Sequence, residues 1–400
     1  MRINLVMFAV MASMAARGAS ALAGDLSAGL TDTTIRLGQT MPYSGPGSSF
    51  SPLGLTEAAY YRMVNEAGGV NGRRIEFISL DDGYQPNRTV EQTRRLVEQD
   101  GVFAMVGSLG TVANAAVQRY LNDKHVPQLF ITTGAGRFAD PEHFPWTIAF
   151  ALHHPAEARV HAKRILATRP DARIAILYQN DDFGREYAAA FRQALGDRAA
   201  AMIVKEESYE PRDPTVDQQV LALRDAGADV LLDIAIPRFA AQAIRRAWDL
   251  GWKPLHIISQ PAASVSATLR PAGLDRSVGV ISADFTKDPA DPSWVEDPEV
   301  IAYLAFMQHY RRDADPYDRN NVGGYINAAA VVALLRLCED GISRENVMHQ
   351  ATHLAGLRVP MMLPGVTMNT TPSNYAGIRQ MRLQRFDGER WRPFGDIVTD

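Results

Sequence analysis

Three residues have a spacing that could bind a metal ion. His153, Glu157 and His161 follow one another at four-residue intervals, which places them on one face of a predicted helix. The sequence nearby supplies no further ligand, and the spacing differs from the H-E-x-x-H motif of zinc enzymes. We therefore interpret the three as partly exposed helix residues and predict no metal site.

Two pairs of adjacent aspartates follow predicted strands, at 81–82 and 181–182. Paired carboxylates could serve as general acid and base, but they could equally cap helices or fix loops. The sequence has no recognisable Ser/His/Asp or Cys/His nucleophile motif and no G-x-x-x-x-G-K-[ST] phosphate loop. We predict that the protein is not an enzyme and keep an exported enzyme that uses these aspartates as an alternative.

A third candidate is GAGRFA, residues 134–139, which matches the dinucleotide pattern G-x-G-x-x-A. A true nucleotide fingerprint opens a helix, whereas Pro141 and Pro145 would break a helix here. We therefore predict no nucleotide cofactor. The glycines instead allow the backbone to approach a small ligand closely.

The turns after the predicted strands share a different chemistry, because they are rich in hydroxyls, glycines and aromatic rings. Their candidate residues are Tyr43, Ser44, Phe50, Ser108, Thr111, Thr132, Thr133, Tyr178 and Phe183. Hydroxyls and free N–H groups at a helix start orient an anionic group, and rings cover an apolar body. This pattern favours binding over catalysis.

These turns must be positioned by an alternation of strands and helices. The predicted strands are short and apolar, as parallel strands buried on both faces should be, and they cover 34–42, 74–82, 102–108, 126–134, 172–180, 201–209, 229–235 and 255–260. Helices are predicted between them, and a pause at 143–155 favours two successive doubly wound α/β domains. Three helices and a hairpin at 378–394 complete the chain. Ligands of such sheets bind beyond the carboxyl ends of the strands.

Composition and the N-terminus indicate which partners and which cellular compartment to expect for this protein. The 400 residues are 46% hydrophobic and carry a net charge of −4, without a basic block interleaved with aromatics, so nucleic acid is not an expected partner. Arg2, an apolar run and Ala21-Leu22-Ala23 predict a cleaved signal peptide at 1–23. Cys338 is the only cysteine, which excludes an internal disulfide and is typical of a core residue.

Longer segments resemble a known family. IRLGQTMPYSGPGSSFSPLG, NEAGGVNGR, DDGYQPNRTVEQTRRLVEQDGVFAMVGSLGT, VPQLFITTGAG, IAILYQNDDFGREY and RPAGLD resemble periplasmic substrate-binding proteins of ABC transporters, in the Leu/Ile/Val class. The resemblance covers about residues 34–396. Within the class, YQNDDFGREY and MMLPGVTMNTTPSNY are most similar to the subgroup for aromatic acids such as hydroxycinnamates and benzoates.

The resemblance implies the type I periplasmic binding protein fold, with two doubly wound lobes that close on a ligand by a hinge motion. It implies one lobe at 24–148 plus 284–358 and another at 149–283 plus 359–400. It also implies a monomer in the periplasm, with a small carboxylate as ligand and an ABC membrane permease as partner. A ligand sensor for a signalling protein is the alternative of another class.

The family's ligand contacts can be carried over by position. The resemblance places the hydroxyl that meets the ligand carboxylate on Thr111. The full expected set is Tyr43, Ser44, Phe50, Ser108, Leu109, Thr111, Thr133, Gly134, Ala135, Gly136, Phe183, Ile236, Gln260 and Tyr325, with the backbone donors at 134–136.

One position departs from the family. The carboxylate that pairs with an amino acid's ammonium falls at or near Gln260, and a neutral amide cannot hold a buried ammonium by charge. We therefore expect a plain carboxylic acid as ligand. An apolar amino acid remains the alternative, with Asp181 or Asp182 supplying the missing charge.

Overall fold

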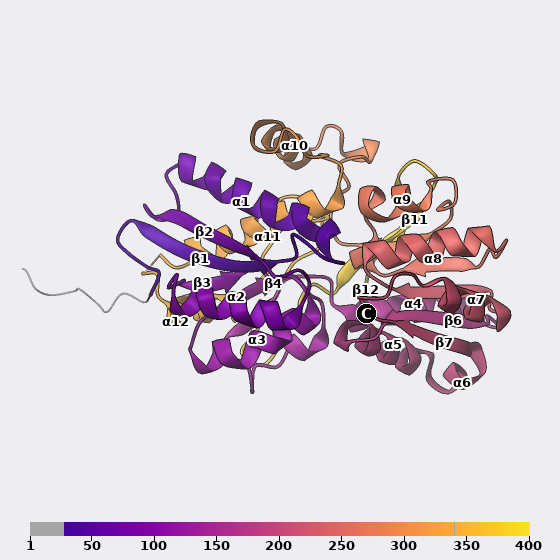
Figure 1. Ribbon diagram of the computed structural model, residues 1–400. Helices are drawn as coiled ribbons and strands as arrows, with labels where there is room; N and C mark the ends of the chain where they lie inside the picture. The colour runs from indigo at the N-terminus through magenta and orange to yellow at the C-terminus, as the bar shows by residue number, and fades with distance from the viewer. Residues whose placement is uncertain (1–27, 340) are drawn as a thin grey trace, which may run out of the picture.

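The computed structural model describes residues 28–339 and 341–400, so the predicted signal peptide lies outside the described residues. Two α/β lobes lie side by side, each with a sheet covered by helices (Figure 1). The predicted fold class is confirmed. In the part of the chain that the structure describes, no helix has the length and apolarity needed to cross a bilayer.

The first lobe holds a five-stranded parallel sheet in the order β2-β1-β3-β4-β5. Its strands are β1 (Thr34–Met41), β2 (Arg74–Asp81), β3 (Ala104–Val106), β4 (Gln128–Ile131) and β5 (Thr147–Ala149). Every residue of β3, β4 and β5 is buried. The nearly continuous apolar runs of the sequence therefore belong to strands covered on both faces, as expected.

The second lobe holds a seven-stranded sheet in the order β12-β11-β10-β9-β8-β6-β7. Its strands are β6 (Ile174–Gln179), β7 (Ile203–Tyr209), β8 (Val230–Ile234), β9 (Leu255–Ile258), β10 (Ile281–Asp284), β11 (Gln380–Phe386) and β12 (Trp391–Thr399). β6 to β10 are parallel, and β11 and β12 form the predicted antiparallel hairpin.

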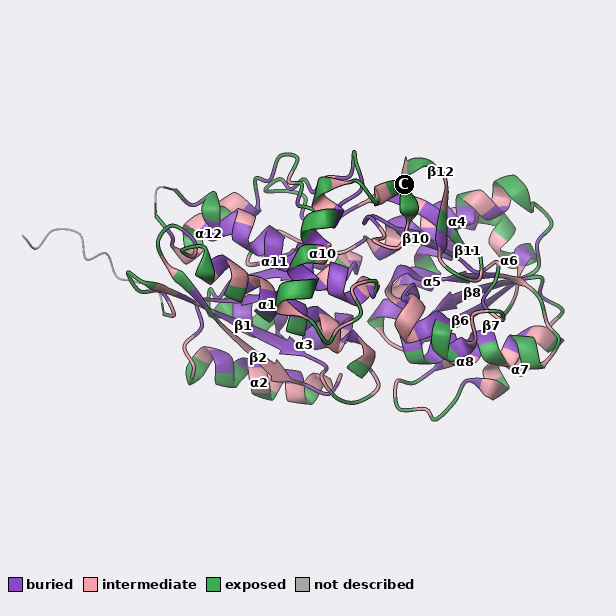
Figure 2. Cartoon of the chain, turned by 90° about the horizontal axis from the view of Figure 1, so that it is seen from above, coloured by how far each residue is buried: buried purple, intermediate pink, exposed green. Residues whose placement is uncertain are grey.

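The helices cover the sheets with their buried faces inward and their exposed faces outward (Figure 2). Local signals set where several begin: a proline occupies the first turn of α2, α4, α8 and α10, and the Asp181 side chain caps α5. The α-helices are α1 (Ser51–Glu66), α2 (Pro86–Glu98), α3 (Thr111–Asp123), α4 (His154–Thr168), α5 (Asp182–Leu195), α6 (Ala199–Met202), α7 (Asp217–Asp225), α8 (Pro237–Asp249), α9 (Arg270–Ala272), α10 (Pro298–Tyr310), α11 (Arg319–Arg336) and α12 (Arg344–Ala351). Short helical turns are η1 (Ser48–Phe50), η2 (Gly136–Phe138), η3 (Gly196–Arg198), η4 (Gln260–Ala262), η5 (Val265–Leu269) and η6 (Pro292–Trp294).

The chain passes between the lobes at three places. It leaves the first sheet after β5 and enters α4, returns after β10, and enters the second sheet again before β11. Two of these crossings lie side by side, because Leu152 and Ile378 form a parallel bridge. The crossing after β10 is held by a bridge between Thr286 and Met362. Three connections between two lobes suit a hinge.

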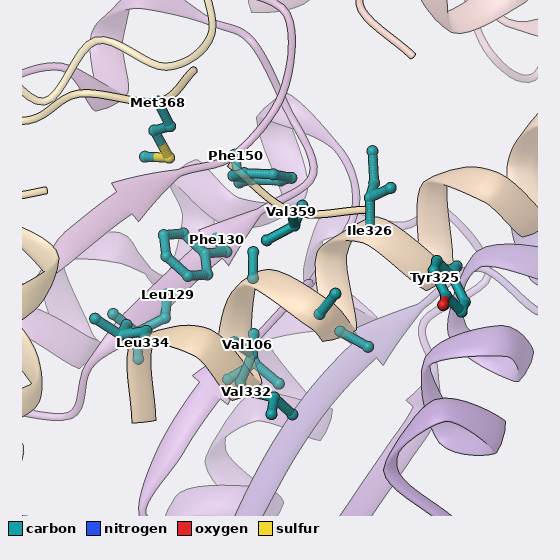
Figure 3. Close-up of a cluster of buried hydrophobic side chains, with 14 of the residues drawn as sticks. Val106, Leu129, Phe130, Phe150, Tyr325, Ile326, Val332, Leu334, Val359 and Met368 are labelled. Carbon is teal, nitrogen blue, oxygen red and sulfur yellow. The ribbon is translucent and has the colours of Figure 1, made fainter. Parts of the chain in front are cut away.

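The expected lobe boundaries stay a prediction. The buried apolar side chains of residues 359–378, which we expect in the second lobe, lie in one core cluster with those of β1, β3 and β4. Figure 3 shows Val359 and Met368 beside Phe130 and Phe150 in this core. We therefore propose that residues 359–378 belong with the first lobe and that the chain enters the second sheet near Ile378.

Each sheet reverses its strand order once, between β1 and β3 in the first lobe and between β6 and β8 in the second. Loops at such a switch point diverge and leave a crevice beyond the carboxyl ends of the strands. The two crevices face each other across the cleft. This arrangement brings the loops after β1, β3, β6 and β8 to one place.

Candidate functional site

A cavity of about 100 Å³ lies between the lobes and is lined by residues of both. The lining residues are Phe50, Leu53, Tyr84, Leu109, Gly110, Thr111, Thr132, Thr133, Gly134, Phe150, Ala151, His154, Phe183, Ile236, Gln260, Pro261, Phe285, Thr286, Arg319, Asn320, Gly323, Ile326 and Asn327. Four phenylalanines among them make the cavity mainly apolar.

Eight residues of the expected contact set line this cavity. They are Phe50, Leu109, Thr111, Thr133, Gly134, Phe183, Ile236 and Gln260. Each follows the end of a strand or opens the next helix, which is where a doubly wound sheet places its loops. The structure therefore brings together the strand-end turns that the sequence singled out.

Three of the other expected residues are engaged outside the cavity lining, on the first lobe. The hydroxyl of Tyr43 lies 2.6 Å from that of Ser79, and Ser44 donates to the Asp81 carboxylate at 2.6 Å. Ser108 is buried and accepts a hydrogen bond from the backbone N–H of Thr40. These polar side chains fix the loops after β1 and β3.

The last three, Ala135, Gly136 and Tyr325, are also absent from the cavity lining. Ala135 is buried in a small apolar cluster, and Tyr325 packs its ring in the first core, with its ring centre 5.0 Å from that of Phe306. The ring of Tyr325 faces this core because aromatic neighbours from α1 and α10 surround it. A tyrosine in a helical sequence does not reveal which face it will take.

The clearest polar group of the cavity is a pair of hydroxyls. Thr111 Oγ1 and Thr133 Oγ1 are 2.7 Å apart, one from the start of α3 and one from the turn after β4. Gly110 precedes α3 with φ of +103°, a conformation that favours glycine, and it offers no side-chain cap. The hydroxyls therefore stand beside a helix start whose partial positive charge suits an anion.

The backbone donors expected at 134–136 are all used by the protein. Gly134 N–H donates to His154 Nε2 at 3.2 Å, Ala135 N–H to Thr133 Oγ1 at 3.3 Å and Gly136 N–H to Glu186 Oε2 at 2.9 Å. His154 and Glu186 belong to the second lobe. Two of these donors therefore hold the lobes together.

His154 is a lining residue that the sequence did not single out as a ligand contact. Burial, with a smaller contribution from the neighbouring His153, lowers the pKa of its imidazole to about 3. A neutral ring agrees with the hydrogen bond that its Nε2 accepts from Gly134. His154 therefore adds no positive charge to the cavity at neutral pH.

The described residues that line the cavity include no aspartate and no glutamate. Asp181 caps α5 through Phe183 N and accepts from Gln179 Nε2, and Asp182 pairs with Arg137 at 2.6 Å. Gln260 does line the cavity, and its backbone N–H donates to buried Glu157. The side-chain amide takes no part in that bond.

The lining also contains one arginine, Arg319. It donates to Asp284 from Nε at 2.6 Å and from Nη2 at 3.3 Å. Thr286 donates to the same carboxylate at 3.0 Å. The charge of Arg319 is therefore balanced at the wall, beside the crossing after β10.

A second group of lining residues escaped the sequence reasoning because it lies along one helix. These residues are Arg319, Asn320, Gly323, Ile326 and Asn327 on α11. They recur at the spacing of one helix face, and this polar and small stripe within an apolar run is the signal that could have found them. A Cβ on Gly323 would lie 2.7 Å from Leu53 Cδ2, so the glycine lets α11 approach α1 closely.

The predicted partial exposure of the three residues with metal-ligand spacing holds for His153 and is wrong for Glu157 and His161. Glu157 and His161 are fully buried, and His153 is half-buried. The apolar positions of α4 share their face with these polar residues, so helical spacing alone could not reveal their burial. Within the described ranges, no group of three or more His, Cys, Asp or Glu residues is arranged to hold a metal ion.

A cavity between two α/β lobes that the chain joins three times is the arrangement of a two-lobed ligand receptor. Residues 34–390 match the family model described as periplasmic binding protein, and the chain belongs to this family.

Relatives of known name support this class. The chain is 23% identical over 315 residues to Leu/Ile/Val-binding protein homolog 7 of Brucella abortus, covering 75% of this chain and 76% of the relative. It is 26% identical over 326 residues to homolog 8 of the same organism, covering 76% and 77%.

Solved structures share the fold. A branched chain amino acid ABC transporter protein from Thermus thermophilus with bound valine has a TM-score of 0.83 at 18% identity, covering 93% of this chain and 98% of that one. A fatty acid ABC transporter substrate-binding protein from Thermomonospora curvata has a TM-score of 0.77 at 20% identity, covering 94% and 95%.

Proposed function

We propose that this receptor captures a small apolar or aromatic carboxylic acid without an ammonium group and delivers it to an ABC permease. In this proposal it works in the periplasm, after removal of the predicted signal peptide. The lobes close around the acid, and the permease recognises the closed form. The receptor performs no reaction on the acid.

The observation that carries the proposal is the charge of the cavity wall. A hydroxyl pair and a helix start suit a carboxylate, whereas no carboxylate among the described lining residues could pair with an ammonium. Burying an unpaired ammonium is costly. The phenylalanines leave an apolar space for the rest of the acid.

An apolar amino acid is the second candidate, and the relatives favour it. Two are named Leu/Ile/Val-binding protein homologs, and one structural neighbour was solved with valine. Another neighbour is named for fatty acids, so receptors of this fold also serve acids without an ammonium. In the amino acid reading, neutral groups such as Gln260 would have to hold the ammonium.

Calorimetric titration of the purified mature protein tests the proposal. The panel contains benzoate, cinnamate, hydrocinnamate, isocaproate, leucine, valine and phenylalanine. We expect micromolar or tighter binding of at least one acid that lacks an amino group. Tight binding of leucine, valine or phenylalanine, with no heat from any acid that lacks an amino group, would overturn the proposal in favour of an amino acid receptor.

A further inference from the structure

Tyr84 stands between two cavities of the molecule. It lines both the cavity between the lobes, of about 100 Å³, and an outer pocket of about 600 Å³. Among the described residues, the two linings share only Gly110 and Thr111 besides Tyr84. Gly110 has no side chain, and the Thr111 hydroxyl is bonded to that of Thr133. The phenol ring of Tyr84 is therefore the large side chain in the partition between the two cavities.

The ring of Tyr84 spans from the first lobe to the second. On its own lobe it packs against glycines: a Cβ on Gly47 would lie 2.8 Å from Tyr84 Cδ2, and a Cβ on Gly110 would lie 3.4 Å from Cε2. On the other lobe, Gln179 at the end of β6 donates from Nε2 to the Tyr84 hydroxyl at 3.3 Å. The ring therefore fills the space between the start of α3 and the end of β6.

Buried groups hold Tyr84 at both ends. Its backbone N–H donates to Asp82 Oδ1 at 2.9 Å, and the same carboxylate accepts from the Thr89 hydroxyl at 2.8 Å. Gln179 is fully buried and also donates to the Asp181 carboxylate at 2.6 Å. The backbone of Tyr84 has a φ of +59°, which bulky residues rarely adopt, and such strained positions cluster at ligand and active sites. The ring is therefore fixed between the lobes.

We propose that the ring of Tyr84 closes the carboxylate end of the ligand site and so selects free acids over derivatives lengthened at the carboxyl group. The ring edge lies against Gly110, directly before Thr111, where we expect the carboxylate. A group added at the carboxyl carbon would have to pass through the partition and displace the ring from Gln179. This inference rests on the proposed function, and it adds a specificity-determining residue to the site.

Glycine conjugates test the inference on the wild type. Benzoylglycine and hydrocinnamoylglycine each keep a carboxylate and lack an ammonium, so the proposed function alone permits them. Calorimetry compares each with its parent acid, benzoate or hydrocinnamate. We expect a parent acid to bind at least about tenfold more tightly than its conjugate, because the conjugate overfills the closed site. Equal or tighter binding of the conjugates would overturn the inference and leave the proposed function standing.

The variant Tyr84→Gly identifies the residue responsible. It removes the ring, and glycine suits the left-handed backbone at this position, so the variant should fold. The preference for the parent acid should fall to about twofold or less, because the two cavities then join. A preference that survives undiminished in folded Tyr84→Gly, judged by its thermal melt, would contradict the assignment. If that variant does not fold, the wild-type comparison decides.

Two further variants separate the ring from its hydroxyl and from other tyrosines. Tyr84→Phe keeps the ring and removes only the bond to Gln179, so it should keep the preference for the parent acid. Loss of the preference in Tyr84→Phe would overturn the role of the ring as a wall. Tyr120→Ala removes a tyrosine of α3 that bonds to Glu98 outside both linings, and this matched control should bind like the wild type.

The same design separates this inference from the proposed function. If the wild type binds only amino acids, the proposed function has failed. Leucine and the dipeptide leucylglycine, which is lengthened at the carboxyl group, then replace the parent acid and its conjugate. A preference for leucine that Tyr84→Gly abolishes would support the role of the ring, and equal binding of leucine and leucylglycine to the wild type would overturn it.

Discussion

Among single residues, the hydroxyl pair at the start of α3 is the group that we expect to hold the carboxylate of the ligand. The hydroxyl oxygens of Thr111 and Thr133 are hydrogen-bonded to each other at 2.7 Å. One hydroxyl donates to the other, so a bound carboxylate can accept from the hydroxyl that remains free to donate and from the first N–H groups of the helix. A hydrogen bond to a charged group contributes about 1.5–3 kcal/mol. The loss of one hydroxyl should therefore be visible in affinity.

Thr111→Val tests this point because valine keeps the shape and removes the hydroxyl. We expect the affinity for the acid to fall about ten- to hundredfold in calorimetry, with little change in melting temperature. Thr168→Val, at the exposed end of α4, should leave binding unchanged. An unaltered affinity in Thr111→Val would remove the hydroxyl from the site.

His154 gives a prediction about pH. Because its pKa is lowered to about 3, mainly by burial, the ring stays neutral throughout the range in which a free histidine titrates. Affinity for the acid should therefore differ by less than about twofold between pH 8 and pH 5.5. A steady rise in affinity as the pH falls through 6.5 would show instead that a protonated His154 holds the carboxylate.

At the scale of elements, the sequence predicted most of the sheet strands and the helices that cover them, because apolar runs, prolines and caps are local signals. It missed β5 and β10, which have three and four residues and carry no pattern of their own. It predicted the strand-end turns that line the cavity, since β-α alternation fixes where those turns lie. The lining residues on α11 could not be predicted, because they depend on which face of a long helix turns toward the cavity. Tyr325 packs in the core, whereas Asn327, two residues later, lines the cavity.

Glu299, at the start of α10, offers a test of how the long segment after β10 is held. Burial alone would raise the pKa of its carboxyl, but hydrogen bonds from Arg358 and Lys287 outweigh it and lower the pKa to about 2. A lowered carboxyl pKa contributes stability above its ordinary value of 4.5, and this contribution is lost as the pH falls toward 2.

Glu299→Gln should therefore reduce the free energy of unfolding at pH 7 by about 1–2 kcal/mol, after allowance for solvent screening. Urea unfolding at pH 7 and pH 3 measures it, and the difference from wild type should shrink at the lower pH. Glu76→Gln, which removes a more exposed pair with Arg36, should cost less than about 0.5 kcal/mol. A pH-independent loss in Glu299→Gln would contradict the electrostatic explanation.

At the scale of the whole molecule, the two lobes meet across the cavity mouth. Arg137 in η2 pairs with Asp182 on α5, and Gly136 donates to Glu186 on the same helix. These contacts cross from one lobe to the other, and we expect them to break when the cleft opens. Exposed ion pairs are weak individually, which suits a receptor that must open again.

Arg137→Ala should raise the dissociation rate of the acid about two- to fivefold and leave the association rate nearly unchanged. Stopped-flow measurements at low and high salt check this, because the variant should lose part of the salt dependence of the wild type. Arg119→Ala, which breaks an exposed pair within α3, is the control. An equal effect of both variants would argue against a closure contact.

We propose that this cavity accepts a carboxylate whose body carries no ammonium. Hydrocinnamate and phenylalanine differ only by the amino group, so the ratio of their affinities, measured by calorimetry on one preparation, tests this proposal. Because no acidic side chain lines the described cavity, we predict a ratio of at least about tenfold in favour of hydrocinnamate. A ratio of about tenfold or more in favour of phenylalanine would contradict the account.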